Sequence, residues 1–139
     1  MCSKFFKLND LDTNTSITAI RLEGPKISVT ERVNTLKKLF SDYKTTISVL
    51  ENYQSRIFWQ NTTDLQFFNN SKNVVAKIVL PPLNTDQLMN KFENEELKYV
   101  VDWAGNLIWV ELPENDSVLL KHLRTEILKL SGHMTIIKA

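Results

Sequence analysis

The sequence predicts an α+β domain in which helices cover an antiparallel sheet. Segments with the strand-like alternation of apolar residues are interleaved with segments whose apolar residues recur at helical spacing. The apolar fraction of 42% and the charged fraction of 24% are ordinary for a globular protein. A chain of 139 residues can bury one hydrophobic core without disulfides or metals. We therefore expect a flexible segment over residues 1–16 and a single α+β domain over residues 17–139.

The N-terminal half is expected to form a βαβα segment that extends the sheet or adds helices to it. Ser28 and Glu31 have the spacing of a capping box at a helix start. After them, apolar residues follow one helical face. The predicted elements are a strand over 17–22, a helix from Ser28 with Val29, Val33, Leu36, Phe40 and Tyr43 on one face, a strand over 45–50 and a helix over 52–68.

The C-terminal half is more regular and predicts the order βαββαβ, which is the ferredoxin-like split unit. Pro81 and Pro82 end its first strand, and Gly132 is placed to end its last helix. A loop predicted over 69–71 precedes this βαββαβ unit. The predicted elements are strands over 74–80, 97–103, 107–112 and 133–137, helices over 85–92 and 116–130, and a tight turn at 104–106.

Charge and cysteine content narrow the function classes. Seventeen basic residues stand against sixteen acidic ones, which argues against a clustered basic nucleic-acid surface. The single cysteine, Cys2, allows no disulfide within the chain and no cysteine-based metal site, as suits a reducing cytoplasm. No apolar run approaches the length of a membrane span, roughly 20 residues.

The chain has only three glycines, Gly24, Gly105 and Gly132. A dinucleotide-binding turn and a phosphate-binding P-loop each need closely spaced glycines, because the backbone must approach the phosphates. Neither pattern is present. Any nucleotide-type cofactor must therefore be held mainly by something else.

The candidate chemical residues are few. His122 and His133 have no spaced Cys, Asp or Glu companions, so no metal site is expected. Trp103 and Trp109 flank the predicted hairpin turn. They are interpreted either as a cross-strand aromatic pair that fixes the register or as an aromatic wall for a planar ligand, with Asp102 at its edge.

Two segments resemble the end of the E subunit of bacterial glycolate oxidase. Asp102–Trp109 is similar to its Asp-Trp-Ala-Gly-Gly-Leu-Val-Trp pattern, and Ser131–Ala139 to its closing Gly-Gly-His-Ala-Thr-Leu, basic residue and alanine. Asn106 and Ser131 stand where that family has glycine. Further matches in the same order are Arg21-Leu22-Glu23-Gly24, Glu51 with Ser55, Trp59 and Phe67-Phe68, and Leu80-Pro81-Pro82.

The resemblance covers residues 17–139 and implies the C-terminal cap or substrate domain of an FAD-linked oxidoreductase that acts on 2-hydroxy acids. In that family an N-terminal domain binds most of the FAD, and only a short polar segment stands before residue 17. The resemblance thus implies that this chain does not bind FAD alone and is inactive alone. A flavin-domain chain or another oxidase subunit would be its partner.

No catalytic residue is assigned in this chain. Trp103, Trp109, His133 and Arg21 are the residues expected to face cofactor or substrate, since an arginine fork suits carboxylates and phosphates. A surface salt bridge is the alternative for Arg21. The alternative for the whole chain is a non-enzymatic interaction module, or the remnant of a split gene, that self-associates as a homodimer.

Overall fold

The computed structural model describes residues 17–43, 45–68, 73–114 and 116–138. Its contacts divide the chain into two compact units, which are described separately. The smaller unit is Ala19–Asp64, and the larger one combines Leu65–Ala139 with Met1–Thr18. The flexible segment predicted over 1–16 and the loop predicted over 69–71 lie outside the described residues.

The larger unit has the element order that the sequence predicts. Three short 3-10 helices connect the main elements: η1 (Gln66–Phe68), η2 (Pro82–Asn84) and η3 (Trp103–Gly105). The helices and strands are β1 (Val74–Val79), α3 (Thr85–Asn94), β2 (Lys98–Asp102), β3 (Leu107–Leu112), α4 (Ser117–Lys129) and β4 (His133–Lys138). The α+β class is therefore confirmed.

The four strands form one antiparallel sheet in the order β2-β3-β1-β4. β1 and β3 are central, and each pairs with a neighbour on both sides. Lys77 of β1 stands opposite Trp109 of β3 and Thr135 of β4. This register decides which side chains from distant parts of the sequence become neighbours.

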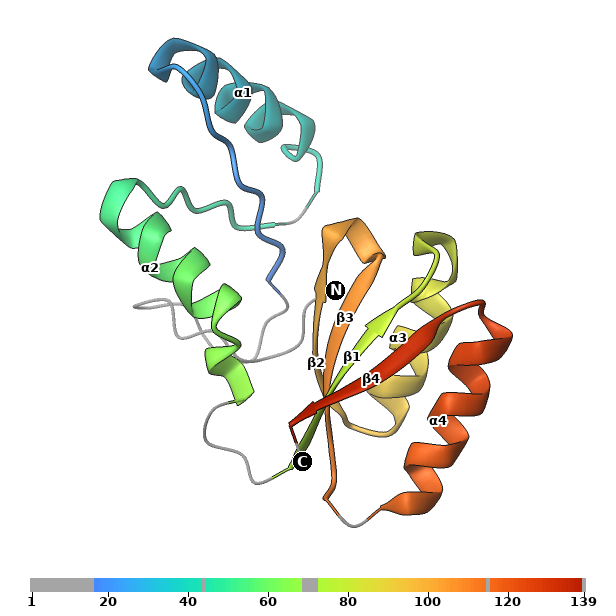
Figure 1. The fold of residues 1–139 in the computed structure, drawn as a ribbon. Coiled ribbons are helices and arrows are strands. Elements are labelled where there is room, and N and C mark those ends of the chain that lie inside the picture. The colour runs from blue at the N-terminus through green and yellow to red at the C-terminus, as the bar shows by residue number, and fades with distance from the viewer. Residues whose placement is uncertain (1–16, 44, 69–72, 115, 139) are drawn as a thin grey trace. The chain divides into compact units, whose positions relative to one another are not determined.

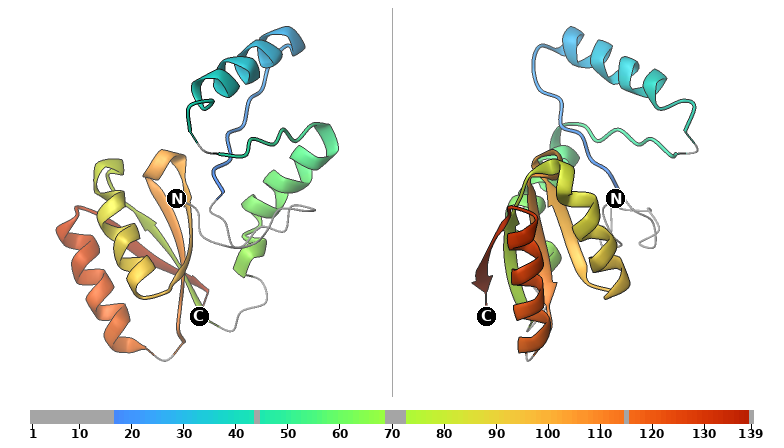
Figure 2. Two further views of the ribbon diagram at one scale, coloured as in Figure 1. Left: turned by 180° about the vertical axis from the view of Figure 1, so that it is seen from behind. Right: turned by 90° about the vertical axis from the view of Figure 1, so that its right-hand side faces the viewer.

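Helices α3 and α4 cover one face of the sheet (Figure 1), and Figure 2 shows the same arrangement from two further sides. Alternate residues of every strand point toward these helices, because successive side chains of a strand face opposite sides. Phe92 of α3 and Tyr99 of β2 lie in ring contact, with centroids 5.4 Å apart. The core is Ala76, Ile78, Leu80, Leu88, Met89, Phe92, Tyr99, Ile108, Val110, Leu112, Leu123, Ile127 and Met134.

The start of α4 is fixed by a side-chain cap. The carboxylate of Asp116 accepts a hydrogen bond of 2.8 Å from the backbone N–H of Leu119. This satisfies one of the donors that a helix start leaves without a partner. We expect Asp116→Ala to lower the free energy of unfolding by about 1 kcal/mol. Urea denaturation followed by circular dichroism measures this, and an unchanged midpoint would show that the cap is dispensable.

The end of α4 differs from the prediction in one respect. Gly132 does not take the left-handed conformation that ends the helix; Ser131 does, with φ +58°. The N–H of Ser131 donates to the carbonyl of Leu128, and the N–H of Gly132 donates to that of Ile127. These two bonds form a Schellman motif. Gly132 is needed for close packing instead, because a Cβ there would lie 2.9 Å from Ile127 Cγ2 and from Leu80 Cβ.

The smaller unit contains two helices, α1 (Lys26–Leu39) and α2 (Asn52–Thr63). The strands predicted over 17–22 and 45–50 are wrong, since both segments are irregular. Their apolar side chains remain exposed: Ile20 by 52%, and Ile47 and Val49 by 44% each. Alternation alone does not make a strand without a surface to pack on. The predicted N-terminal extension of the sheet is therefore wrong for the described residues.

Both helices of the smaller unit depart from their predicted bounds. α1 begins at Lys26 after Pro25, so Ser28 lies inside the helix and the predicted capping box does not form. Proline suits a helix start because its φ is already helical. α2 ends at Thr63 rather than at 68, because Leu65 has φ +51°, which breaks the helical path. No helix of the described residues is long and apolar enough to cross a membrane.

Candidate functional site

The sheet has a second face, on the side away from α3 and α4, which we call the distal face. It collects the strand residues that alternate with the core residues. Its rows follow from the register of the three strand pairs. One row is Asp102, Leu107, Val79 and His133; the next is Val100, Trp109, Lys77 and Thr135; the third includes Lys98, Glu111 and Val75.

Trp109 and Lys77 are the centre of the distal face. They are directly paired across β3 and β1, and Lys77 Nζ lies 5.8 Å from the centroid of a Trp109 ring. This is a cation–π distance. Both side chains are half-buried. The arrangement holds a cation beside an aromatic surface in the middle of the sheet, where the strands are most rigid.

Glu111 is the carboxylate nearest to this centre in the register, and its charge is already compensated. Lys98 Nζ lies 3.6 Å from Glu111 Oε2, and Asn73 Nδ2 donates to Glu111 Oε1 over 3.0 Å. Lys98 also donates to the carbonyl of Phe67 and lies 5.5 Å from the ring centroid of Phe68. Glu111 is only 9% exposed, so this set closes one end of the distal face.

The two tryptophans do not form the predicted cross-strand pair. β2 ends at Asp102, and Trp103 lies in η3 with φ +50°. Its side chain is 66% exposed. Trp109 faces Val100 and Lys77 instead. The strand predicted over 97–103 therefore ends one residue early, and the interpretation of Trp103 and Trp109 as a cross-strand pair is wrong.

The turn after β2 is held by side chains that the alternation pattern does not reveal. The carboxylate of Asp102 accepts from the N–H of Trp103 over 2.7 Å. The buried hydroxyl of Thr85 donates to the carbonyl of Gly105 over 2.5 Å. Ala104 also has a positive φ of +52°. These bonds offset the cost of left-handed backbone at two residues with side chains.

The remaining predicted site residues are divided between the two units. His133 is exposed at the start of β4, in the same row of the distal face as Asp102. Arg21 belongs to the smaller unit, where it pairs with Glu23 and lies 5.9 Å from a Trp59 ring. The alternative interpretation of Arg21, a surface salt bridge, is thus what the structure contains. The structure brings together Asp102, Trp109 and His133 on one face of the larger unit.

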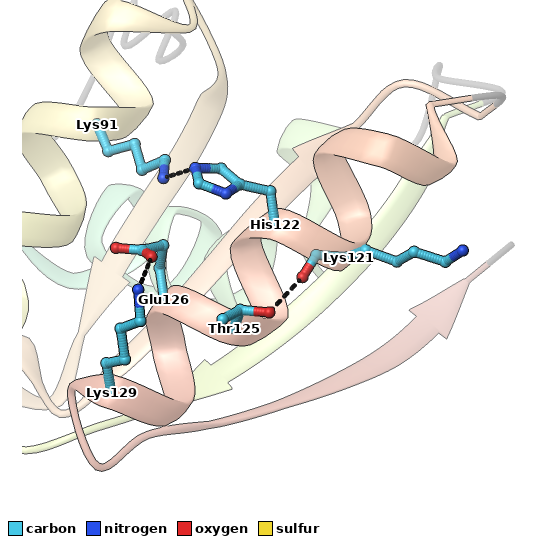
Figure 3. A network of polar contacts seen from close by, with 6 residues as sticks. All are labelled: Lys91, Lys121, His122, Thr125, Glu126 and Lys129. Carbon is cyan, nitrogen blue, oxygen red and sulfur yellow. Dashed lines mark hydrogen bonds and ion pairs between the residues drawn. The ribbon is translucent and has the colours of Figure 1, made fainter.

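His122 lies on the other side of the sheet, in the helix layer (Figure 3). Lys91 of α3 lies 2.5 Å from His122 Nε2, and Lys129 Nζ donates to Glu126 over 2.8 Å. The hydrogen bond from Lys129 is the main cause that lowers the pKa of the Glu126 carboxyl. All of these groups lie on α3 and α4, so this network links surface helices and does not belong to the distal face.

Lys77 and Thr135 were not among the residues predicted to form a site. A signal for Lys77 does exist, since it is the only charged residue in the apolar strand Val74–Leu80. A charge in such a strand must point to a face that is not fully buried. Thr135 carries no comparable signal, because its position beside Lys77 depends on the strand order.

The chain was compared with known families and proteins. No family model, no curated protein and no solved structure matches it. Within the described residues no group of three or more His, Cys, Asp or Glu side chains is placed to hold a metal ion. The residues of the distal face and the sequence motifs that contribute them are therefore the basis on which a function can be proposed.

Proposed function

We propose that this chain is the C-terminal cap or substrate domain of a glycolate oxidase-like FAD-linked oxidoreductase that acts on 2-hydroxy acids. One observation carries the proposal. The two motifs on which the resemblance rests, Asp102–Trp109 and Ser131–Ala139, contribute Asp102, Trp109 and His133 to a single face of one sheet. Motifs two dozen residues apart thus form one continuous surface.

The chemistry of that surface suits a cap over a flavin and its substrate. Trp109 offers an aromatic plane, and Lys77 places a positive charge beside it. 2-Hydroxy acids are anions, and a cation in a site shielded from water attracts them far more strongly than it would in solution. When bound, the flavin would accept the hydride, and this chain's residues would orient the substrate and exclude water.

We propose that this chain alone does not bind the whole FAD molecule. Its pyrophosphate needs a glycine-rich turn or a helix start that the backbone can bring close to the phosphates. Among the three glycines, Gly105 and Gly132 serve a buried turn and a helix–strand contact in the larger unit. The distal face fits the ring end and the substrate only, which agrees with a cap domain that works with a separate flavin domain.

We also propose a ferredoxin-like topology for the larger unit and a cytoplasmic location. The order βαββαβ and the strand order β2-β3-β1-β4 support the topology. The single cysteine supports a reducing compartment. A different function, self-association as a homodimer, is favoured by the edge strands β2 and β4, each of which has one neighbour in the sheet.

Reconstitution tests the cap-domain proposal. The purified chain is mixed with the FAD-loaded N-terminal domain of a bacterial glycolate oxidase E subunit that lacks its own C-terminal domain. Adding glycolate is expected to bleach the flavin absorbance in the mixture and in neither component alone. The chain alone is expected to be colourless and to show no micromolar affinity for FAD in a fluorescence titration.

Two variants serve as controls. Trp109→Ala should abolish the bleaching, whereas Val118→Ala, which removes an exposed apolar side chain from α4, should leave it unchanged. Absence of bleaching with the unmodified chain contradicts the cap-domain proposal. A stable homodimer by light scattering in that case favours the self-associating module.

A further inference from the structure

Lys77 stands alone as a charge in β1. The other residues of that strand are valine, alanine and isoleucine, and the neighbours of Lys77 across the sheet are Trp109 and Thr135. Its side chain is half-buried. Placing an ammonium group in such surroundings costs free energy unless it is paired or meets a ligand. The charge of Lys77 therefore requires either a carboxylate of this chain or a bound ligand.

No carboxylate of the described residues lies within ion-pair distance of Lys77. Glu111 is a diagonal neighbour in the register, but Lys98 and Asn73 already occupy its two carboxylate oxygens. Asp102 lies at the β2 edge, two strands away, and accepts from the backbone N–H of Trp103. The positive charge of Lys77 is thus left over after the acidic groups of the distal face are assigned.

Two further hydrogen-bonding side chains, Thr135 and His133, stand beside this cation on β4. Thr135 is directly opposite Lys77, and His133 is opposite Val79, one step further on the same face. Directly opposed side chains have Cβ atoms about 5 Å apart, and diagonal ones about 7 Å apart. Both are exposed, so a ligand can reach them. A hydroxyl and an imidazole N–H can each donate to an oxygen.

We infer that Lys77, Thr135 and His133 form a binding site for one carboxylate group, with Trp109 as its apolar wall. A carboxylate accepts several hydrogen bonds and carries one negative charge, which matches the uncompensated ammonium of Lys77 and two further hydrogen-bond donors. A phosphate dianion would require further positive charge, and Lys98 is already committed to Glu111. A small monocarboxylate is the ligand that this set fits.

That the carboxylate belongs to a 2-hydroxy acid rests on the proposed function. The face next to the site carries an indole plane, and Thr135 and His133 are exposed on its β4 side. A short acid can place its carboxylate at Lys77 and its hydroxyl-bearing carbon over the Trp109 ring. The carboxylate site itself depends only on the geometry of β1, β3 and β4.

Glycolate titration of the full-length ¹⁵N-labelled chain tests the site. The amide signals of Lys77 and Thr135 and the indole N–H signal of Trp109 are expected to shift, with a dissociation constant in the millimolar range. Glycolamide, which has the same shape without the charge, should shift none of them. Absence of these shifts with glycolate, or equal shifts with glycolamide, overturns the inference.

Variants of single lysines separate the site from general charge attraction. Lys77→Met keeps an unbranched side chain that is one atom shorter and removes the charge, so glycolate should bind roughly tenfold more weakly. Lys121→Met removes an exposed charge from α4 and should not change the affinity. Preserved signal dispersion in both variants shows that they fold. Equal affinities of Lys77→Met and the unmodified chain, or equal losses in the two variants, contradict the site.

The reconstituted enzyme distinguishes this inference from the proposed function. If glycolate binds the chain but no flavin bleaching is restored, the cap-domain proposal fails and the carboxylate site stands. If bleaching is restored and Lys77→Met leaves its glycolate concentration dependence unchanged, the site fails and the cap-domain proposal stands. A rise in KM of roughly tenfold with little change in kcat supports both.

Discussion

Replacing Gly132 by alanine is expected to lower the free energy of unfolding of the larger unit by about 2 kcal/mol. The added Cβ would lie 2.9 Å from Ile127 Cγ2, 2.9 Å from Leu80 Cβ and 3.1 Å from the carbonyl oxygen of Ile127. All three atoms belong to Ile127 and Leu80, two core residues that are almost fully buried. The contact therefore cannot be relieved by moving a flexible side chain into solvent.

The loss should appear in β1 and α4, because Gly132 packs against Leu80, which follows β1, and against Ile127 of α4. Native-state hydrogen exchange of the β1 amides measures it, and an increase of about 30-fold in exchange rate corresponds to the expected change. His133 follows Gly132 directly, so the variant should also weaken glycolate binding at the distal face.

The neighbouring residue supplies a matched control for Gly132→Ala. Ser131 has φ +58°, which disfavours any residue with a Cβ. Ser131→Gly is therefore expected to raise the free energy of unfolding by about 0.5 kcal/mol, since the relieved strain slightly exceeds the added chain entropy. If both variants changed the free energy of unfolding in the same direction and by the same amount, close packing would not be the reason why residue 132 is a glycine.

The C-terminal half was predictable from its sequence because local signals and packing agree there. The bounds of β3 match the predicted 107–112, since a run of mostly apolar residues lies there between the predicted turn at 104–106 and Pro113. The start of α4 matches because Asp116 is both the predicted first residue and the observed cap. Where propensity, periodicity and capping predict the same element, tertiary contacts stabilise that element and do not replace it with another.

The N-terminal half was predicted less well because its patterns have no surface to pack on within their own unit. Residues 17–22 and 45–50 alternate like strands, yet neither pairs with another strand among the described residues. Among the described residues of the smaller unit, Phe58 of α2 is the only one that is buried, and α1 buries no residue. Strand formation needs a hydrogen-bonding neighbour, which an alternation pattern cannot supply.

Some residues of the candidate site on the distal face could be predicted from the sequence, and others could not. Trp109 and His133 were selected from the sequence, and the structure places both on the distal face. Trp103 was misplaced because its positive φ depends on the hydrogen bonds of Asp102 and Thr85, and tryptophan itself gives no hint of it. Lys77 was overlooked because its partners come from β3 and β4, and strand order cannot be read from spacing.

Loss of the Lys98 charge is expected to have the largest effect on stability. In Lys98→Met, Glu111 loses its cation while its side chain remains only 10% exposed. Removing one partner of a nearly buried ion pair leaves a charge without compensation, and we expect the free energy of unfolding to fall by about 3 kcal/mol. The variant also loses the hydrogen bond to the Phe67 carbonyl, so η1 should lose its attachment to β2. Urea denaturation followed by circular dichroism measures the change.

The double variant Lys98→Met/Glu111→Gln separates the charge effect from the lost contacts of the lysine stem. Removing the carboxylate charge as well should recover about half of the lost stability, because an amide costs less to bury than a charge without a partner. If the double variant is no more stable than Lys98→Met, the ion pair is not the source of the loss and the contacts to Phe67 and Phe68 are.

We expect Lys98 to affect binding as well, because its charge pairs with Glu111, the diagonal neighbour of Lys77. In Lys98→Met the freed carboxylate of Glu111 faces Lys77 diagonally across β1 and β3 and should attract its ammonium group. Glycolate would then compete with an internal carboxylate, and its affinity should fall although none of the residues that bind it has changed. Restored affinity in the Lys98→Met/Glu111→Gln double variant would show that the pairing of Lys98 with Glu111 controls the carboxylate site at Lys77. Equal glycolate affinity in the unmodified chain and Lys98→Met would instead show that the two rows act independently.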